Sequence, residues 1–128
     1  MKTLSIIIPC FNEVNTIQEI IERVRASDIT LQKQIIVIDD CSTDGTSELL
    51  NESLNNQVDI IYSQTVNRGK GAAIRKGLEF ATGDVLLIQD ADLEYDPSEY
   101  SKLLAPIFEL HSLNQNDWFL SFQFFYKF

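Results

Sequence analysis

The chain alternates short apolar runs with longer segments in which apolar residues recur every three or four positions. The short runs, rich in Ile, Val and Leu, predict four buried β-strands, at residues 4–8, 34–38, 58–63 and 84–89. Because these runs are continuously apolar, we expect both faces of their sheet to be covered.

Helices are predicted after each of these strands. The first spans residues 15–26, and Thr16 with Glu19 predicts a capping box at its start. The second runs through residues 49–54, and the third follows a glycine-rich loop and ends near Gly83. The pattern therefore predicts an α/β fold with a mainly parallel sheet and alternating helices, of Rossmann-like type.

The fourth helix is predicted from its start signals. Asp96, Pro97 and Glu99 are an N-cap residue, a first-turn proline and an acid at the third position. They open a helix that continues through residues 103–108. We therefore interpret Asp96 as a helix cap and not as a ligand of a site.

A polar cluster follows each strand: "PCFNE", "DDCSTD", "QTVNRGKG" and "DADLE". In open parallel sheets, ligands bind beyond the carboxyl ends of the strands. The four clusters are therefore expected to meet at one crevice.

Composition narrows the classes of function. The formal charge of −9 argues against a nucleic-acid-binding protein, which usually carries a basic face. Cys10 and Cys41 have no metal-binding spacing, so we expect reduced cysteines and a cytoplasmic chain. No apolar run reaches the roughly 18 residues that a membrane-spanning helix needs. The length fits one domain.

Asp90 and Asp92 are two residues apart in an extended segment, so their carboxylates can face the same point. A divalent cation with hard oxygen ligands, Mg²⁺ or Mn²⁺, would relieve their repulsion. The alternative is a solvated turn between a strand and a helix, where aspartate is common. Taken alone, the pair favours the turn, and Glu94 is a further candidate ligand.

Asp40 ends the second strand, where a carboxylate can accept hydrogen bonds from a nucleobase or a ribose hydroxyl. We favour this function for Asp40 and a structural turn for Asp44. In "NRGKGAA", Arg68 and Lys70 could face phosphates, although the segment matches neither phosphate-binding fingerprint. Arg75 and Lys76 are interpreted as a solvated helix face.

The first cluster offers weaker signals. Phe11 could pack beside a base ring, and Glu13 could bind a hydroxyl or a loop amide. His111 is the single histidine of the chain and is interpreted as a surface residue, so no catalytic triad is predicted.

Together and in order, "SIIIPCFNE", "IIVIDDCSTDGT", "NRGKGAAIRKGLEFATGD" and "LLIQDADLEYDP" resemble the family 2 glycosyltransferases of GT-A fold. They are most similar to the branch of dolichol- or polyprenyl-phosphate sugar transferases. The resemblance covers about residues 3–108. It implies inverting transfer of a sugar from a UDP- or GDP-linked donor, with Mg²⁺ or Mn²⁺, to an acceptor such as a lipid phosphate.

The resemblance also implies roles for matching positions. The base and ribose would be lined by Pro9, Phe11, Glu13 and Asp40, and the phosphates by Lys70 and Arg68. Asp90 would serve both nucleotide and metal. Asp92 and Glu94 would complete the metal site, with Glu94 standing where the family often has glutamine.

The tail at residues 109–128 departs from the family. A Gly-Ser-Arg segment expected after the fourth helix is absent, and aromatic residues crowd the last eleven positions. We expect a nucleotide-sugar-binding part at residues 1–108 and an atypical tail left by truncation or a shifted reading frame. The catalytic base would then lie in the missing half, and the activity of this chain is uncertain. The full-length parent would be membrane-associated.

Other interpretations of the tail and of the chain stay open. The tail could be an edge strand, or residues 118–128 could be a homo-oligomer contact. The chain could instead be a non-catalytic receiver-like or oligomerising α/β module. A receiver needs an aspartate at its third strand end, where this sequence has "IIYSQT", and a sugar-phosphate nucleotidyltransferase needs a glycine-rich loop in place of "PCFNE".

Overall fold

The computed structural model describes residues 3–93, 96–102, 104, 118–121 and 125–127, with side chains up to residue 104. The predicted strands are all present. Their bounds are β1 (Thr3–Cys10), β2 (Gln32–Asp39), β3 (Ile60–Ser63) and β4 (Val85–Ile88). Each differs from its predicted run by one or two residues at an end.

The strands form one sheet in the order β3-β2-β1-β4-β5-β6. The pairs β1–β2, β2–β3 and β1–β4 are parallel, as predicted. β5 (Trp118–Ser121) continues the parallel sheet beside β4, and β6 (Phe125–Lys127) pairs antiparallel with β5. The backbone of these tail segments thus agrees with the edge-strand alternative.

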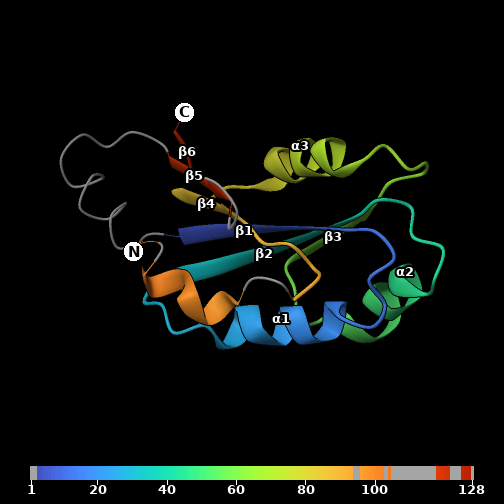
Figure 1. Cartoon of the computed structure of the whole chain (residues 1–128), viewed down its shortest axis with the longest axis horizontal. Helices are drawn as coiled ribbons and strands as arrows, with labels where there is room; N and C mark the ends of the chain where they lie inside the picture. Colours follow the sequence, from blue (N-terminus) through green and yellow to red (C-terminus); the bar gives the residue numbers. More distant parts are fainter. Residues whose placement is uncertain (1–2, 94–95, 103, 105–117, 122–124, 128) are drawn as a thin grey trace.

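Helices cover both faces of the sheet (Figure 1). They are α1 (Ile17–Ala26), α2 (Thr46–Leu49), the π-helical η1 (Leu50–Leu54), α3 (Lys70–Phe80) and the 3₁₀ turn η2 (Pro97–Glu99). In the figure, α1 and α2 lie below the sheet and α3 lies above it. The second predicted helix therefore exists, but its second half is π-helical.

Two hydrophobic cores fill the spaces between the layers. Alternate residues of β1, including Leu4, Ile6 and Ile8, pack on the α1 side. Ile7 points to the other face, where it packs with Ala73 of α3. α3 approaches closely because it has a glycine there: a Cβ at Gly77 would lie 2.6 Å from Ile7 Cγ2.

The two predicted caps have different outcomes. The Asp96 cap is confirmed, because its Oδ1 accepts a hydrogen bond from the Ser98 amide at 3.0 Å, with Pro97 in the first turn. The capping box at Thr16 is wrong, because no side chain caps α1. The Thr16 hydroxyl is instead used in a contact 75 residues away in the chain. Of the predicted fourth helix, Tyr100–Lys102 and Leu104 are helical, and the rest lies outside the described residues.

The order of strands reverses between β1 and β4, which are neighbours in the sheet although β2, β3 and four helices lie between them in the chain. Such a switch point opens a crevice at the carboxyl ends. Pro9 contributes to this opening. The last hydrogen bond between β1 and β4 runs from Gln89 N to Ile7 O at 2.9 Å. The next bond would need a backbone N–H at position 9, and proline has none.

Candidate functional site

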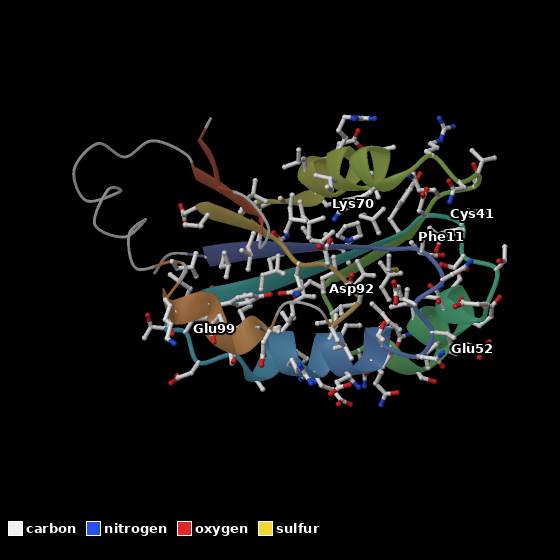
Figure 2. All side chains as sticks on the ribbon, viewed as in Figure 1. Phe11, Cys41, Glu52, Lys70, Asp92 and Glu99 are labelled. Atoms are coloured by element: carbon white, nitrogen blue, oxygen red, sulfur yellow. The ribbon has the colours of Figure 1, made fainter. Side chains whose placement is uncertain are left out.

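A cavity of about 240 Å³ lies at the carboxyl ends of β1, β2 and β4. Its lining comes from the ends of these three strands and from the start of α3: Pro9, Cys10, Phe11, Glu13, Asp40, Lys70, Ala73, Asp90, Ala91 and Asp92. Figure 2 shows Phe11, Lys70 and Asp92 toward this end of the sheet, with Glu99 toward the opposite end. The predicted convergence of polar clusters is therefore present in the fold.

The loop after β1 is held in place by the loop after β2. Asn12, which has φ of 53°, accepts a hydrogen bond from the Thr43 amide at 2.7 Å, and its own amide donates to the Ser42 hydroxyl at 2.9 Å. The Glu13 amide donates to the Thr46 hydroxyl at 3.0 Å. These bonds hold Phe11 at the cavity while leaving it 44% exposed, so its ring is available to a flat ligand.

Asp44 has the structural role that its sequence context predicts. Its carboxylate accepts hydrogen bonds from the amides of Thr46 and Val14, at 3.0 and 3.2 Å. Burial alone would raise the pKa of Asp44, but the hydrogen bonds from Thr46 and Val14 lower it below its ordinary value. Asp44 does not line the cavity.

Asp40 is buried, and both of its carboxylate oxygens are engaged. Oδ1 accepts from the Arg68 amide at 2.8 Å and from Gln64 Nε2 at 3.3 Å, and Oδ2 accepts from the Gly69 amide at 2.8 Å. Asp40 therefore holds the glycine-rich loop against the end of β2, in addition to lining the cavity. The neighbouring Asp39 accepts from the Ser42 hydroxyl and the Cys10 thiol.

The glycine-rich loop places Lys70 at the first position of α3, directly over the cavity. α3 has no acidic residue in its first turn, whereas the other described helices carry Glu19, Glu48, Glu52 and Glu99 there. A helix N-terminus carries partial positive charge and free amide donors. The start of α3 thus presents positive charge that its own sequence does not neutralise.

Arg68 takes a different position from Lys70. Its amide binds Asp40, and its side chain lines a second cavity between α3 and the end of β3, with Tyr62, Arg75 and Lys76. Lys76 pairs there with Glu79 at 2.9 Å and lies 4.9 Å from the centre of the Tyr62 ring. The structure therefore brings Lys70, but not the Arg68 side chain, to the first cavity.

The segment Asp90–Asp92 is fixed through its backbone carbonyls. The Asp90 carbonyl accepts from Gln89 Nε2 at 3.1 Å, and Gln89 Oε1 in turn accepts from the buried Tyr100 hydroxyl at 2.6 Å. The Ala91 carbonyl accepts from the Thr16 hydroxyl at 2.6 Å. Burial, with a smaller contribution from Asp96, raises the pKa of Tyr100 well above its ordinary value, so Tyr100 stays a donor.

The Asp90 carboxylate forms an ion pair with Lys70 across the cavity. Asp92 is exposed, and both carboxylates line the same space. With Glu13 and Asp40, the cavity carries four carboxylates and one ammonium group, a formal charge of −3. An anionic ligand would therefore be repelled unless a cation accompanied it.

Asp90 and Asp92 are the candidate metal ligands that line the cavity. Within residues 3–93 and 96–104, apart from residue 103, no three His, Cys, Asp or Glu side chains are grouped to hold a metal ion. Asp90 and Asp92 are hard oxygen donors of the kind that suits Mg²⁺ or Mn²⁺. Two protein ligands leave room for phosphate oxygens and water, so the donor set fits such an ion. Glu94 lies outside the described residues.

Cys10 lies beside the site but is not a candidate nucleophile. Burial first, and then the nearby Asp39 carboxylate, raise the pKa of the Cys10 thiol far above its ordinary value. A thiol in this state does not form the reactive thiolate. Cys10 and Cys41 are both free.

The cavity contains the predicted residues Pro9, Phe11, Glu13, Asp40, Lys70, Asp90 and Asp92. Sequence reasoning did not predict the lining residues Cys10, Ala73 and Ala91, nor the supports Thr16, Gln89 and Tyr100. Ala73 could have been found from its position, because it lies three residues after Lys70 on the same helix face. The supports depend on contacts between distant segments and have no local signal.

A parallel α/β sheet with a carboxylate pair at its switch point defines a ligand-binding α/β domain. The chain belongs to the glycosyl transferase family 2, whose model matches residues 5–115. This membership confirms the resemblance predicted from the four motifs, and it replaces the receiver-like alternative.

Curated relatives include undecaprenyl-phosphate 4-deoxy-4-formamido-L-arabinose transferases. The Klebsiella pneumoniae protein is 34% identical over 109 residues, and the Salmonella paratyphi A protein is 36% identical. Each alignment covers 82% of this chain but only 33% of the relative. The chain thus spans about a third of the length of the curated relatives it matches.

Solved structures share the fold. Staphylococcus aureus TarS 1–349 in complex with UDP-GlcNAc has a TM-score of 0.70 and 27% identity, covering 88% of this chain and 32% of that chain. Glucosyl-3-phosphoglycerate synthase from Mycobacterium tuberculosis, in complex with Mn²⁺, UDP and glucosyl-3-phosphoglycerate, has a TM-score of 0.68 and 26% identity. That alignment covers 83% of this chain and 39% of the synthase.

A third solved structure is the mannosyltransferase PcManGT from Pyrobaculum calidifontis, in complex with GDP-Man and Mn²⁺. It has a TM-score of 0.67 and 27% identity, covering 80% of this chain and 32% of that chain. In the part of the chain that the structure describes, no helix has the length and apolar character needed to cross a bilayer.

Proposed function

We propose that the chain is the nucleotide-sugar-binding part of a family 2 glycosyltransferase, which transfers a sugar with inversion from a nucleoside diphosphate to an acceptor. The observation that carries the proposal is the cavity at the switch point. It combines an exposed aromatic ring, an ammonium group at a helix N-terminus and two carboxylates on one loop. These three features match the base, the diphosphate and the metal of such a donor.

Different residues of the cavity are suited to the base, the ribose and the phosphates of the donor. The exposed ring of Phe11 is suited to pack on a base, and Glu13 and Asp40 offer oxygens to base N–H groups or ribose hydroxyls. Asp40 keeps acceptor capacity for this, since a carboxylate has about four acceptor sites and three hydrogen bonds occupy it here. Lys70 and the first amides of α3 face the position of the phosphates.

Asp90 and Asp92 would hold Mg²⁺ or Mn²⁺ against the diphosphate. A bound divalent ion would neutralise the charge that builds on the departing diphosphate. Two observations support this cofactor: the formal charge of −3 in the cavity, and the Mn²⁺ in the mannosyltransferase and synthase complexes. Glu94 is proposed as a further ligand of this ion.

The acceptor proposed for the whole protein is a polyprenyl phosphate, by analogy with the names of the curated relatives. Such an acceptor simplifies the chemistry. A phosphate monoester carries a charge of about −1.5 to −2 at neutral pH, so its attacking oxygen needs no base to remove a proton. The donor half of the site would then supply most of the required catalysis by binding and orienting the diphosphate.

Calorimetry with UDP and with GDP, in Mn²⁺ and in chelator, tests the donor and its metal. We expect one of the two nucleotides to bind in Mn²⁺ and to bind far more weakly in chelator. Asp92→Ala should abolish the metal dependence. Glu52→Ala is the matched control, because Glu52 is an exposed acid on η1 and does not line the cavity. Metal-independent binding, or equal binding by the Asp92 variant, would overturn the proposal.

A further inference from the structure

The Lys70–Asp90 ion pair joins two residues of the proposed donor site to each other. Lys70 Nζ contacts Asp90 Oδ1 across the cavity, from the start of α3 to the segment after β4. The other four ion pairs described involve residues that do not line the cavity. This pair therefore has a direct bearing on what can bind there.

The two partners differ in their freedom to move. The Asp90 side chain is 11% exposed, and its backbone carbonyl is held by Gln89. The Lys70 side chain is 49% exposed and has a flexible four-carbon stem. Because the Asp40 carboxylate holds the amides of Arg68 and Gly69, the backbone before Lys70 stays in place while the Lys70 side chain turns.

A divalent cation and the Lys70 ammonium group would compete for Asp90. Both are positive, and a cation bound at Asp90 would lie within a few ångströms of the ammonium group, where like charges repel. Lys70 must turn away before the cation can bind well. A diphosphate beside the start of α3 would give the ammonium group a new partner.

We propose that Lys70 is a built-in competitor of the divalent cation at Asp90, and that the diphosphate of the donor draws Lys70 away. This inference rests on the proposed function and adds a coupling between cation binding and nucleotide binding. The cation alone binds weakly because Lys70 opposes it. Bound nucleotide raises the affinity for the cation, and bound cation raises the affinity for the nucleotide. The two affinities rise by the same factor because linkage is reciprocal.

The test is a titration of the full chain with Mn²⁺. Binding is measured by calorimetry or by the loss of the free Mn²⁺ signal in electron paramagnetic resonance. Without nucleotide, Lys70→Met should bind Mn²⁺ about 5- to 10-fold more tightly than the wild-type chain. With saturating UDP or GDP, whichever binds, this advantage should shrink. The same variant should bind the nucleotide more weakly in Mn²⁺.

Two further variants separate charge from a general effect of mutation. Lys70→Arg keeps the positive charge and should keep weak Mn²⁺ binding. Lys76→Met removes a lysine of the same helix whose ammonium group pairs with Glu79 outside the cavity, so Mn²⁺ binding should not change. Circular dichroism of each variant checks the fold.

The outcomes separate the two proposals. Equal or weaker Mn²⁺ binding by Lys70→Met, including no measurable binding by either protein, overturns the competition. If nucleotide binding still depends on Mn²⁺ and on Asp92, the proposed function survives that result. If Lys70→Met binds Mn²⁺ more tightly but no nucleotide binds, the competition holds and both the release by diphosphate and the proposed function fall.

Discussion

Two acidic pairs follow two strands that lie on either side of β1, and the structure uses them in opposite ways. Asp39 and Asp40 end β2, and Asp90 and Asp92 follow β4. In the sequence the pairs look alike, since each follows a buried apolar run with at most one residue between. In the fold, one pair is bound mainly by the protein and the other faces the cavity.

The first pair is held mainly by internal donors. Asp40 accepts two backbone amides and one side-chain amide, and Asp39 accepts the Ser42 hydroxyl and the Cys10 thiol. The second pair is supported through its backbone, which leaves the carboxylate of Asp90 to a movable lysine. A carboxylate that accepts hydrogen bonds from fixed backbone amides stabilises the fold. A carboxylate paired with the ammonium group of a flexible side chain can exchange partners.

The largest effect on stability is expected from Asp40→Ala. The change removes the acceptor of three donors in a residue that is 3% exposed. We expect the free energy of unfolding to fall by about 2 kcal/mol, because two loop amides and the buried Gln64 amide would lose their partner. Urea unfolding measures this, with Glu52→Ala as the control. A loss below about 1 kcal/mol would show that the hydrogen bonds to Asp40 contribute little to stability.

The Asp92→Asn variant should show the reverse profile. Asp92 is exposed, so the free energy of unfolding should stay within about 0.5 kcal/mol of the wild-type value. Mn²⁺-dependent nucleotide affinity should fall by at least about 10- to 100-fold, because one of the two carboxylates proposed to bind the metal is lost. Urea unfolding and calorimetry on the same preparation give both values. A large loss of stability with unchanged nucleotide binding would contradict the proposed difference between the two acidic pairs.

A smaller effect is expected from Tyr100→Phe, which removes only the hydroxyl that donates to Gln89. The free energy of unfolding should fall by about 1 kcal/mol. Mn²⁺ affinity in the presence of nucleotide should fall several-fold, because Gln89 holds the carbonyl of Asp90 less firmly. Thermal unfolding and calorimetry measure the two effects. Unchanged Mn²⁺ affinity would mean that the Asp90–Asp92 segment does not depend on this support.

The smallest effect on stability is expected at Asp96, which follows Asp90 and Asp92 in the chain and is the N-cap of η2. The hydrogen bond from the Ser98 amide lowers the pKa of Asp96 below its ordinary value. A carboxyl with a lowered pKa in the folded state stabilises the fold above its unfolded pKa of about 4 and loses that effect as the pH falls through the folded value. Asp96→Asn should therefore flatten the decline in stability below about pH 4. An unchanged acid profile in urea unfolding would contradict this.

The alternation of strands and helices was predictable because it depends on local periodicity. The carboxyl-end site followed from topology, since parallel strands bring their ends to one edge. Its members Phe11, Lys70, Asp90 and Asp92 were found in this way and by resemblance to the family.

The supports of the site were not predictable, and the physical reason is the same in each case. Thr16 looked like a cap because a local rule exists for caps, yet its hydroxyl donates to Ala91, which is 75 residues away. Arg68 was predicted to face phosphates, yet its amide binds Asp40, which is 28 residues away, and its side chain lines a different cavity. Such contacts are set by how the layers pack, and a single sequence carries no signal for them.

The most direct test of the account is to locate the metal by nuclear magnetic resonance. Mn²⁺ is paramagnetic and broadens signals of nearby nuclei. In the presence of nucleotide, substoichiometric Mn²⁺ should first broaden the backbone amide signals of Asp90, Ala91 and Asp92, and those of Lys33 and Gln57, beside the start of β2, should stay sharp. Broadening centred on another group of acids, or no selective broadening, would contradict the assignment of Asp90 and Asp92 as the metal-binding pair.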